Sequence, residues 1–164
     1  IGQHNPHLIP RGLPGEGNLL VFDNGGQGGY GFANPARPDG TNAMTRDSSR
    51  VLEINPVTLE VVWEYTLGGT ERYRFYSAYV SNAQRLPNGN TLVNEGMDGR
   101  IFELTSEEEI VWEYVNPFLS DDDTPSRRIY RAYRVPYDWI PQVTQPTENA
   151  VIPPELKNFR VPSC

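Results

Sequence analysis

Two histidines near the start of the chain are the residues best suited to nucleophilic chemistry. His4 and His7 are the only histidines in the sequence. A neutral imidazole can act as a nucleophile or as a general base near neutral pH. Residues three apart on a regular strand face opposite sides, so we do not expect these two to share a metal ion unless Pro6 breaks the alternation. With no third ligand in the sequence, we expect no metal site.

Tyrosine, serine and arginine form a second group of candidates. Tyr76 and Ser77 precede one predicted strand, and Tyr130 and Arg131 lie in a segment rich in Arg and Tyr. Such side chains can hold a flat aromatic ligand that carries an anionic group. Packing between sheets, together with surface ion pairs, is the alternative interpretation for most of them.

Asn24 belongs to a third candidate, the run Phe22-Asp-Asn-Gly-Gly26 at the end of a predicted strand. It opens a Gly-rich insertion that extends to residue 48. Long insertions of this kind are commonly lids or rims over a binding site, although a solvated loop or an oligomer contact is equally compatible with the sequence. The glycines do not form a dinucleotide or phosphate-binding fingerprint, because no helical pattern follows them.

The elements that position these residues are predicted from internal similarity. Residues 51–65 and 101–114 both read as strand, turn and strand, and both end in Trp-Glu-Tyr. Upstream, residues 13–21 and 86–93 share Leu-Pro and Gly-Asn, at an offset that places Ser77 opposite His4. The predicted strands are 4–11, 18–23, 50–55, 60–66, 77–86, 90–95, 100–104 and 109–115. Four antiparallel strands per unit predict an all-β fold made of β-propeller blades.

This pattern also predicts how the chain is organised. Residues 1–137 should form a partial propeller, with blades over about 4–66 and 77–115 and a third opening at 129–135. Residues 138–164 should form an extended Pro-rich tail. Because a propeller needs at least about four blades, we expect the remaining blades to come from an N-terminal part of the same protein or from another chain. Two hairpin pairs in a β-sandwich are the alternative.

Composition excludes several classes of partner. A net charge of −7 makes nucleic acid an unsuitable ligand, since phosphate binding requires a basic face. No apolar run approaches the roughly 18 residues that a membrane-spanning helix needs. The single cysteine, Cys164, rules out an internal disulfide. The 15 Pro and 15 Gly favour short strands and turns over a helical bundle.

The ordered motifs of the chain resemble those of a known family, the bacterial-type arylsulfate sulfotransferases. They include Gly2-Gln-His-Asn5, Gly17-Asn-Leu-Leu-Val-Phe-Asp-Asn-Gly25, Ala83-Gln-Arg-Leu-Pro-Asn-Gly-Asn-Thr-Leu92 and Ile129-Tyr-Arg-Ala-Tyr133. The resemblance covers most of residues 1–137, in the order of the family's C-terminal half. It implies a six-bladed propeller that moves a sulfuryl group from an aryl sulfate to a phenol. No cofactor is implied.

The resemblance also assigns roles to residues. The family's nucleophile is the His of a Gln-His motif, so His4 is expected to form a covalent sulfohistidine. The expected substrate-binding residues around it are His7, Asn24, Tyr76, Ser77, Tyr130 and Arg131. A periplasmic or extracellular location is implied as well.

One departure from the family leaves a second interpretation open. The family's other catalytic His and Arg residues belong to blades N-terminal to this chain, so residues 1–164 alone are not expected to be a competent enzyme. The alternative is a non-catalytic propeller fragment that serves as a binding or structural module. The two differ in whether further His and Arg residues converge on His4.

Overall fold

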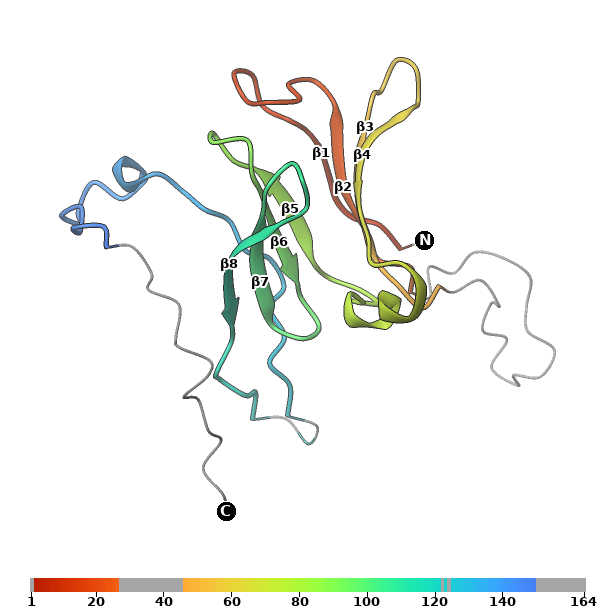
Figure 1. The fold of residues 1–164 in the computed structure, drawn as a ribbon. Helices are drawn as coiled ribbons and strands as arrows, with labels where there is room; N and C mark the ends of the chain where they lie inside the picture. Colours follow the sequence, from red (N-terminus) through yellow and green to blue (C-terminus); the bar gives the residue numbers. More distant parts are fainter. Residues whose placement is uncertain (1, 27–45, 122, 124, 150–164) are drawn as a thin grey trace. The chain divides into compact units, whose positions relative to one another are not determined.

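The computed structural model describes residues 2–26, 46–121, 123 and 125–149, and Figure 1 shows its fold. Within these residues the regular structure consists of strands and two short 3-10 helices, η1 (Gly69–Arg74) and η2 (Tyr137–Trp139). The strands are β1 (His4–Leu8), β2 (Leu19–Asp23), β3 (Arg50–Ile54), β4 (Val61–Tyr65), β5 (Asn82–Arg85), β6 (Thr91–Glu95), β7 (Arg100–Leu104) and β8 (Ile110–Val115). The chain divides into two units, residues 1–134 and residues 135–164.

All the strands lie in the first unit and form two four-stranded antiparallel sheets. The first sheet has the order β1-β2-β3-β4 and the second the order β5-β6-β7-β8. Within each sheet, each strand pairs with the next along the chain, as short connections between antiparallel strands favour. The chain is therefore all-β, as the sequence predicts. Neither sheet is closed on itself.

The turn between the first two strands of each sheet corrects the alignment made from the sequence. In the first sheet the Ile9 N–H donates to the Asn18 carbonyl, and in the second the Leu86 N–H donates to the Asn90 carbonyl, each at 2.8 Å. The structural counterpart of Leu86 is therefore Ile9, and both are buried. The Leu-Pro pair at Leu13 lies inside a longer connection, so its match to the second sheet does not reflect the fold.

The same correction applies to the first strand. His4 lies opposite Phe22 on β2, and Asn82 lies opposite Asn94 on β6. Since β2 and β6 pair with their third strands in the same register, the counterpart of His4 is Asn82. Ser77, which the offset had placed opposite His4, precedes the strand. The predicted strand 77–86 is thus shorter, because its first residues form an irregular segment instead.

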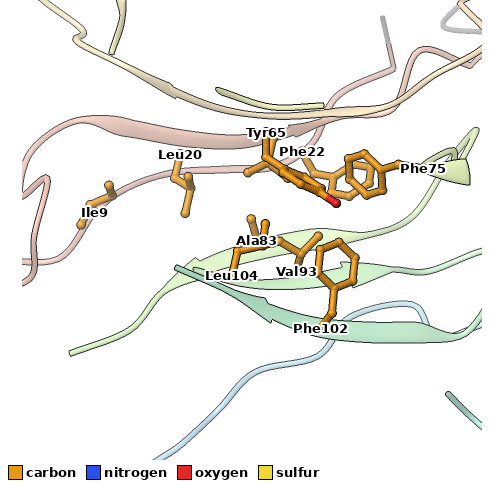
Figure 2. Packing of buried hydrophobic residues seen from close by; sticks show 10 residues of the cluster. Ile9, Leu20, Phe22, Tyr65, Phe75, Ala83, Val93, Phe102 and Leu104 are labelled. Atoms are coloured by element: carbon orange, nitrogen blue, oxygen red, sulfur yellow. The ribbon is translucent and has the colours of Figure 1, made fainter. Parts of the chain in front are cut away.

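The core lies between the two sheets and combines one face of each (Figure 2). Its centre is aromatic: Phe75 lies 5.6 Å from Phe22, 5.0 Å from Tyr65 and 5.8 Å from Phe102, measured between ring centroids. The surrounding buried side chains are aliphatic and come from both sheets, namely Ile9, Leu20, Val51, Ala83, Val93 and Leu104. Phe75 precedes β5, so the segment between the sheets is itself anchored in the core.

Both sheets carry the same ion-pair contact at a buried glutamate of their third strand. A glutamate of the third strand pairs with an arginine further along the chain, and that arginine lies over the tryptophan of the fourth strand. The first set is Glu53, Arg85 and Trp63, and the second is Glu103, Arg134 and Trp112. Trp63 and Trp112 are opposite Glu53 and Glu103 on their neighbouring strands, so they occupy equivalent positions, as predicted.

Residues 129–134 run beside β5 without forming a strand. Asn82 donates its Nδ2 to the Ala132 carbonyl at 2.7 Å and accepts the Ala132 N–H at 2.9 Å. Gln84 makes the same pair of bonds with Arg134, at 3.0 and 2.8 Å. Side-chain amides thus take the place of most of a backbone ladder. Asn94 adds a third amide, and the Ser81 N–H adds a backbone bond to the Tyr130 carbonyl. The predicted third unit is present here only as a segment that these bonds hold beside the second sheet.

The second unit has little regular structure in its described part. Residues 135–149 contain the single turn η2 and extended or bent backbone. The rest of the predicted tail, residues 150–164, and most of the Gly-rich insertion, residues 27–45, lie outside the described residues. Among the residues described, no helix is long and apolar enough to cross a membrane.

Candidate functional site

His4 begins β1, an edge strand, and is half-buried. The register of β1 shifts between His4 and His7, which lie opposite Phe22 and Leu20. These two partners are two residues apart on β2 and so share a face, which places both histidines on one side of the sheet. The left-handed backbone of Asn5, with φ of 52°, lies within this irregularity. The alternation that would separate the histidines is broken here.

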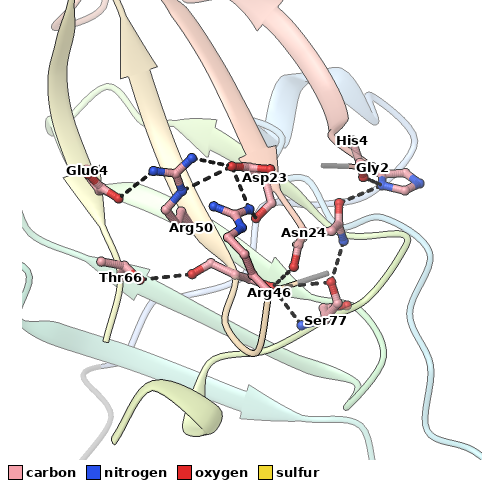
Figure 3. Close-up of polar contacts among 10 residues, drawn as sticks. Gly2, His4, Asp23, Asn24, Arg46, Arg50, Glu64, Thr66 and Ser77 are labelled. Atoms are coloured by element: carbon pink, nitrogen blue, oxygen red, sulfur yellow. Dashed lines mark hydrogen bonds and ion pairs between the residues drawn. The ribbon is translucent and has the colours of Figure 1, made fainter. Parts of the chain in front are cut away.

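The ring of His4 is held at both nitrogens, and Figure 3 shows its contacts with Gly2 and Asn24. Nδ1 lies 2.7 Å from Asn24 Oδ1 and 2.9 Å from the Gly2 carbonyl oxygen. Nε2 accepts the Val80 N–H at 3.3 Å. Three neighbours therefore fix the orientation of His4. Gly2 precedes β1, Asn24 follows β2, and Val80 belongs to the segment before β5.

Asn24 connects the first sheet to that segment. Its Nδ2 donates to the Ser77 carbonyl at 2.7 Å and to the Val80 carbonyl at 3.0 Å. Its own carbonyl accepts the Ser49 hydroxyl at 2.8 Å. Both ends of its side-chain amide and its backbone carbonyl thus have partners, which is the pattern of a structural link in a low-dielectric interior.

The segment 77–81 is strained and is held mainly by hydroxyl groups. Val80 and Ser81 have φ of 58° and 79°, a region that costs a β-branched residue about 1–2 kcal/mol or more. The Ser81 hydroxyl donates to the Ser77 hydroxyl at 2.8 Å, and the Ser77 hydroxyl accepts the Met97 N–H. The Ser77 N–H donates to the Ser49 hydroxyl at 2.8 Å. This network keeps the Val80 N–H directed at His4, and strain of this kind is concentrated at functional sites.

A buried ion-pair cluster lies beside Asn24. Asp23 is bound at 2.7 Å by both Arg46 and Arg50, and Arg50 also reaches Glu64 at 3.4 Å. Burial would raise the pKa of Asp23, but its hydrogen bonds and the positive charges of Arg50 and Arg46 outweigh burial and lower it. Asp23 is therefore ionised, and it anchors the strand end from which Asn24 projects.

The second sheet has a similar cluster with the opposite electrostatic outcome. Glu95 ends β6 and is bound by Arg100, at 3.2 Å, and by the Tyr76 N–H, at 2.8 Å. Burial raises the pKa of Glu95 and is only partly offset by these partners. Arg100 also pairs with Glu113. One arginine shared between two carboxylates stabilises each of them less than two arginines stabilise Asp23.

The remaining predicted site residues are dispersed. The backbone N–H of Tyr76 donates to Glu95, away from His4 in the hydrogen-bond network. His7 Nδ1 lies 3.0 Å from the Asn5 carbonyl oxygen. Tyr130 is 63% exposed and stacks under the Arg131 guanidinium at 5.2 Å, while its carbonyl accepts the Ser81 N–H. The structure thus joins His4, Asn24 and Ser77 in one network and leaves the Tyr130–Arg131 pair on the surface, linked to it through Ser81.

Two members of the network were missed from the sequence. Ser49, which precedes Arg50, was not selected as a site residue. Val80 contributes only a backbone N–H, and no pattern predicts left-handed backbone at a β-branched residue. A signal for Ser49 does exist, since a serine just before a strand is well placed to bind neighbouring backbone groups.

Other kinds of site are not found among the described residues. No three His, Cys, Asp or Glu side chains in residues 2–26, 46–121, 123 and 125–149 are close enough to hold a metal ion. A hollow of about 490 Å³ is lined by residues of the connection after β8, such as Phe118, Leu119 and Arg128, and His4 is not among its lining residues. The His4 network therefore remains the candidate for chemistry.

A family model matches most of the chain. Residues 1–121 match the family model described as Arylsulfotransferase (ASST), which covers both sheets and the whole His4 network. Searches of the curated proteins and of the solved structures found no match to the chain.

Proposed function

The chain belongs to the arylsulfotransferase family, and on that premise we propose that it helps to move a sulfuryl group from an aryl sulfate to a phenol, with His4 as the nucleophile. The observation that carries this proposal is the setting of His4. Its Nδ1 faces only oxygen acceptors, which requires a proton on Nδ1, and the lone pair of Nε2 is left to react.

The proposed reaction has two half-reactions at Nε2. In the first, the Nε2 lone pair attacks sulfur, the bond from sulfur to the aryl oxygen breaks, and a phenolate leaves. A sulfohistidine results, and the proton on Nδ1 stays between Asn24 and Gly2. In the second, the oxygen of an acceptor phenol attacks sulfur, the Nε2–S bond breaks, and the phenol proton passes to solvent or a general base. His4 then regains its lone pair.

The hydrogen bond from the Val80 N–H to His4 Nε2 must break before Nε2 can attack sulfur. It donates to Nε2 at 3.3 Å, a long bond that an incoming sulfuryl group can replace at small cost. We propose that the exposed pair of Tyr130 and Arg131 binds the aryl sulfate. The Tyr130 ring, which lies under the Arg131 guanidinium, would contact the aryl group, and the guanidinium would bind the sulfuryl oxygens. His7 and Tyr76 are proposed as further contacts.

We further propose that the two sheets are consecutive blades of a propeller completed by blades outside residues 1–137. Two features support this architecture: the matching registers of the sheets, and the repeated Glu, Trp and Arg contact at their last strands. The segment 129–134 would be the innermost strand of the next blade. Its Arg134 contacts the second sheet as Arg85 contacts the first.

One observation favours a second candidate function. Among the described residues, the hydrogen-bond partners of His4 are Gly2, Asn24 and Val80, and none of them is cationic. Sulfuryl transfer calls for positive charge near the developing phenolate and sulfuryl oxygens. If the other blades bring no His or Arg to His4, the chain is a binding or structural module.

An assay separates the two candidates. The complete protein is mixed with an aryl sulfate that releases a coloured phenol, with and without an acceptor phenol. The enzyme hypothesis predicts ping-pong kinetics, and a loss of at least about 10³-fold in kcat for His4→Asn. No phenol release by the wild-type protein would establish the non-catalytic alternative.

A further inference from the structure

The side-chain amide of Asn24 contacts both His4 and Val80, and Val80 in turn contacts the other ring nitrogen of His4. Its Oδ1 faces Nδ1 of the imidazole at 2.7 Å, and its Nδ2 holds the carbonyl of Val80, whose N–H faces Nε2. We propose that Asn24 is a positioning residue that fixes the tautomer and the orientation of His4. The inference rests on the proposed function, because it assigns the residue that prepares the nucleophile.

The tautomer follows from the donors and acceptors around Asn24. Its Nδ2 lies within bonding distance of two carbonyl oxygens, those of Ser77 and Val80, so this atom must be the amide nitrogen. The atom that faces His4 is then an oxygen, which accepts only. Gly2 offers Nδ1 a second acceptor. The proton of the neutral ring therefore resides on Nδ1, and Nε2 carries the lone pair that attacks sulfur.

The second amide hydrogen bond acts on the other side of the ring. Val80 and Ser81 are held in left-handed backbone that their side chains disfavour. Nδ2 of Asn24 binds the carbonyl oxygens of Ser77 and Val80, three residues apart, and so clamps the turn between them. Without the clamp the turn is free to relax, and the Val80 N–H loses its direction towards Nε2. The Asn24 side chain thus determines the hydrogen-bond partners of both ring nitrogens of His4.

Direct contact between Asn24 and substrate is incompatible with its position. The residue is 0% exposed, and both ends of its amide already have partners inside the protein. The expected consequence is that Asn24 affects the rate of the chemical step and leaves the affinity for aryl sulfate unchanged. A substrate-binding residue would have the opposite signature.

The protein itself supplies a matched control. Asn94, at the end of β6, is also 0% exposed, and its Nδ2 also donates to two carbonyls, those of Ile129 and Tyr130, at 3.1 and 3.4 Å. It contacts no histidine through the hydrogen bonds of the described residues. Substituting Asn94 removes the same kind of buried amide and the same kind of clamp, without touching His4.

The first test is the tautomer of His4 in the wild-type chain, measured by long-range ¹H–¹⁵N correlation NMR of the imidazole rings. The chain has two histidines, so His7 serves as an internal reference. We expect the proton of the neutral His4 ring on Nδ1. A proton on Nε2 overturns the proposal, and this measurement needs no variant to fold.

The second test compares Asn24→Leu with Asn94→Leu in the complete enzyme. A catalytic histidine in the wrong tautomer can lose up to about 10⁴-fold in kcat, so we expect Asn24→Leu to lose at least about 10²-fold. KM for the aryl sulfate should stay within about twofold of the wild-type value, and His4 should show mixed tautomers. Asn94→Leu should retain kcat and the His4 tautomer, and any effect should fall on KM, because Asn94 holds the carbonyl of Tyr130, a proposed substrate contact. An Asn24→Leu enzyme with full kcat, or with raised KM alone, overturns the proposal.

These readouts distinguish failure of the inference from failure of the proposed function. A wild-type protein that transfers no sulfuryl group, yet keeps the proton on Nδ1 and loses it in Asn24→Leu, contradicts the enzymatic function and supports the positioning of His4 by Asn24. A wild-type enzyme that turns over with the proton on Nε2 supports the enzymatic function and contradicts the positioning of His4 by Asn24.

Discussion

Replacing Phe75 with alanine should weaken the docking of the two sheets more than any other single truncation in the core. Its ring is 0% exposed and lies 5.6 Å from Phe22, 5.0 Å from Tyr65 and 5.8 Å from Phe102. A buried Phe→Ala change costs about 3–5 kcal/mol through lost burial and the cavity it leaves. Ring pairs at these distances each add about 0.5–1.5 kcal/mol beyond burial. We therefore expect a loss of about 4 kcal/mol in the free energy of unfolding.

Urea unfolding followed by tryptophan fluorescence measures this loss. With a slope of about 2 kcal/mol per M, the midpoint for Phe75→Ala should fall by about 2 M. Phe118→Ala makes the same chemical change at a residue that is 75% exposed, and it should alter stability by less than about 0.5 kcal/mol. If Phe75→Ala and Phe118→Ala have equal midpoints, the aromatic cluster does not hold the sheets together and the reasoning fails.

Two further predictions concern buried charge. Because its partners lower the pKa of Asp23, its contribution should be complete above the pKa of about 4 that an unfolded carboxyl has, and should be lost as the pH falls through the lowered folded value. Asp23→Asn should cost roughly 2 kcal/mol at pH 7 and clearly less at about pH 3, as urea unfolding at the two pH values would reveal. A cost that is the same at both pH values would contradict this. Arg85→Met should cost about 3–5 kcal/mol by leaving the Glu53 carboxylate buried without its cation, and adding Glu53→Gln should restore much of that loss. If the double variant is no more stable than Arg85→Met, the two residues are not coupled.

Much of the fold was predictable because its signals are local. Alternating apolar residues and the two Trp-Glu-Tyr runs indicated the strands, and each strand pairs with its neighbour along the chain. The alignment between the two units was less secure, since Leu13-Pro14 resembles Leu86-Pro87 by composition alone. Only the backbone bonds of the turns identify Ile9 as the counterpart of Leu86. A difference in loop length is enough to defeat an ungapped comparison.

The sequence selects one residue of the candidate site and not the network around it. His4 is selected because it begins a predicted strand and follows Gln3. Its dependence on Asn24 and Val80 could not be predicted, since those contacts join residues far apart in the sequence through an amide and a backbone N–H. Backbone donors leave no trace in residue types. Tertiary packing alone decides where they are directed.

The most direct test of the account is to trap the covalent intermediate. The complete protein is exposed to an aryl sulfate without acceptor, digested under non-acidic conditions, and the peptides are examined by mass spectrometry with fragmentation. We predict that the peptide containing His4 gains the mass of one sulfuryl group, located on the His4 ring, and that a phenol added before digestion removes it while itself becoming sulfated. A protein that releases the donor phenol while His4 stays unmodified, or that carries the sulfuryl group on another residue, would contradict the account.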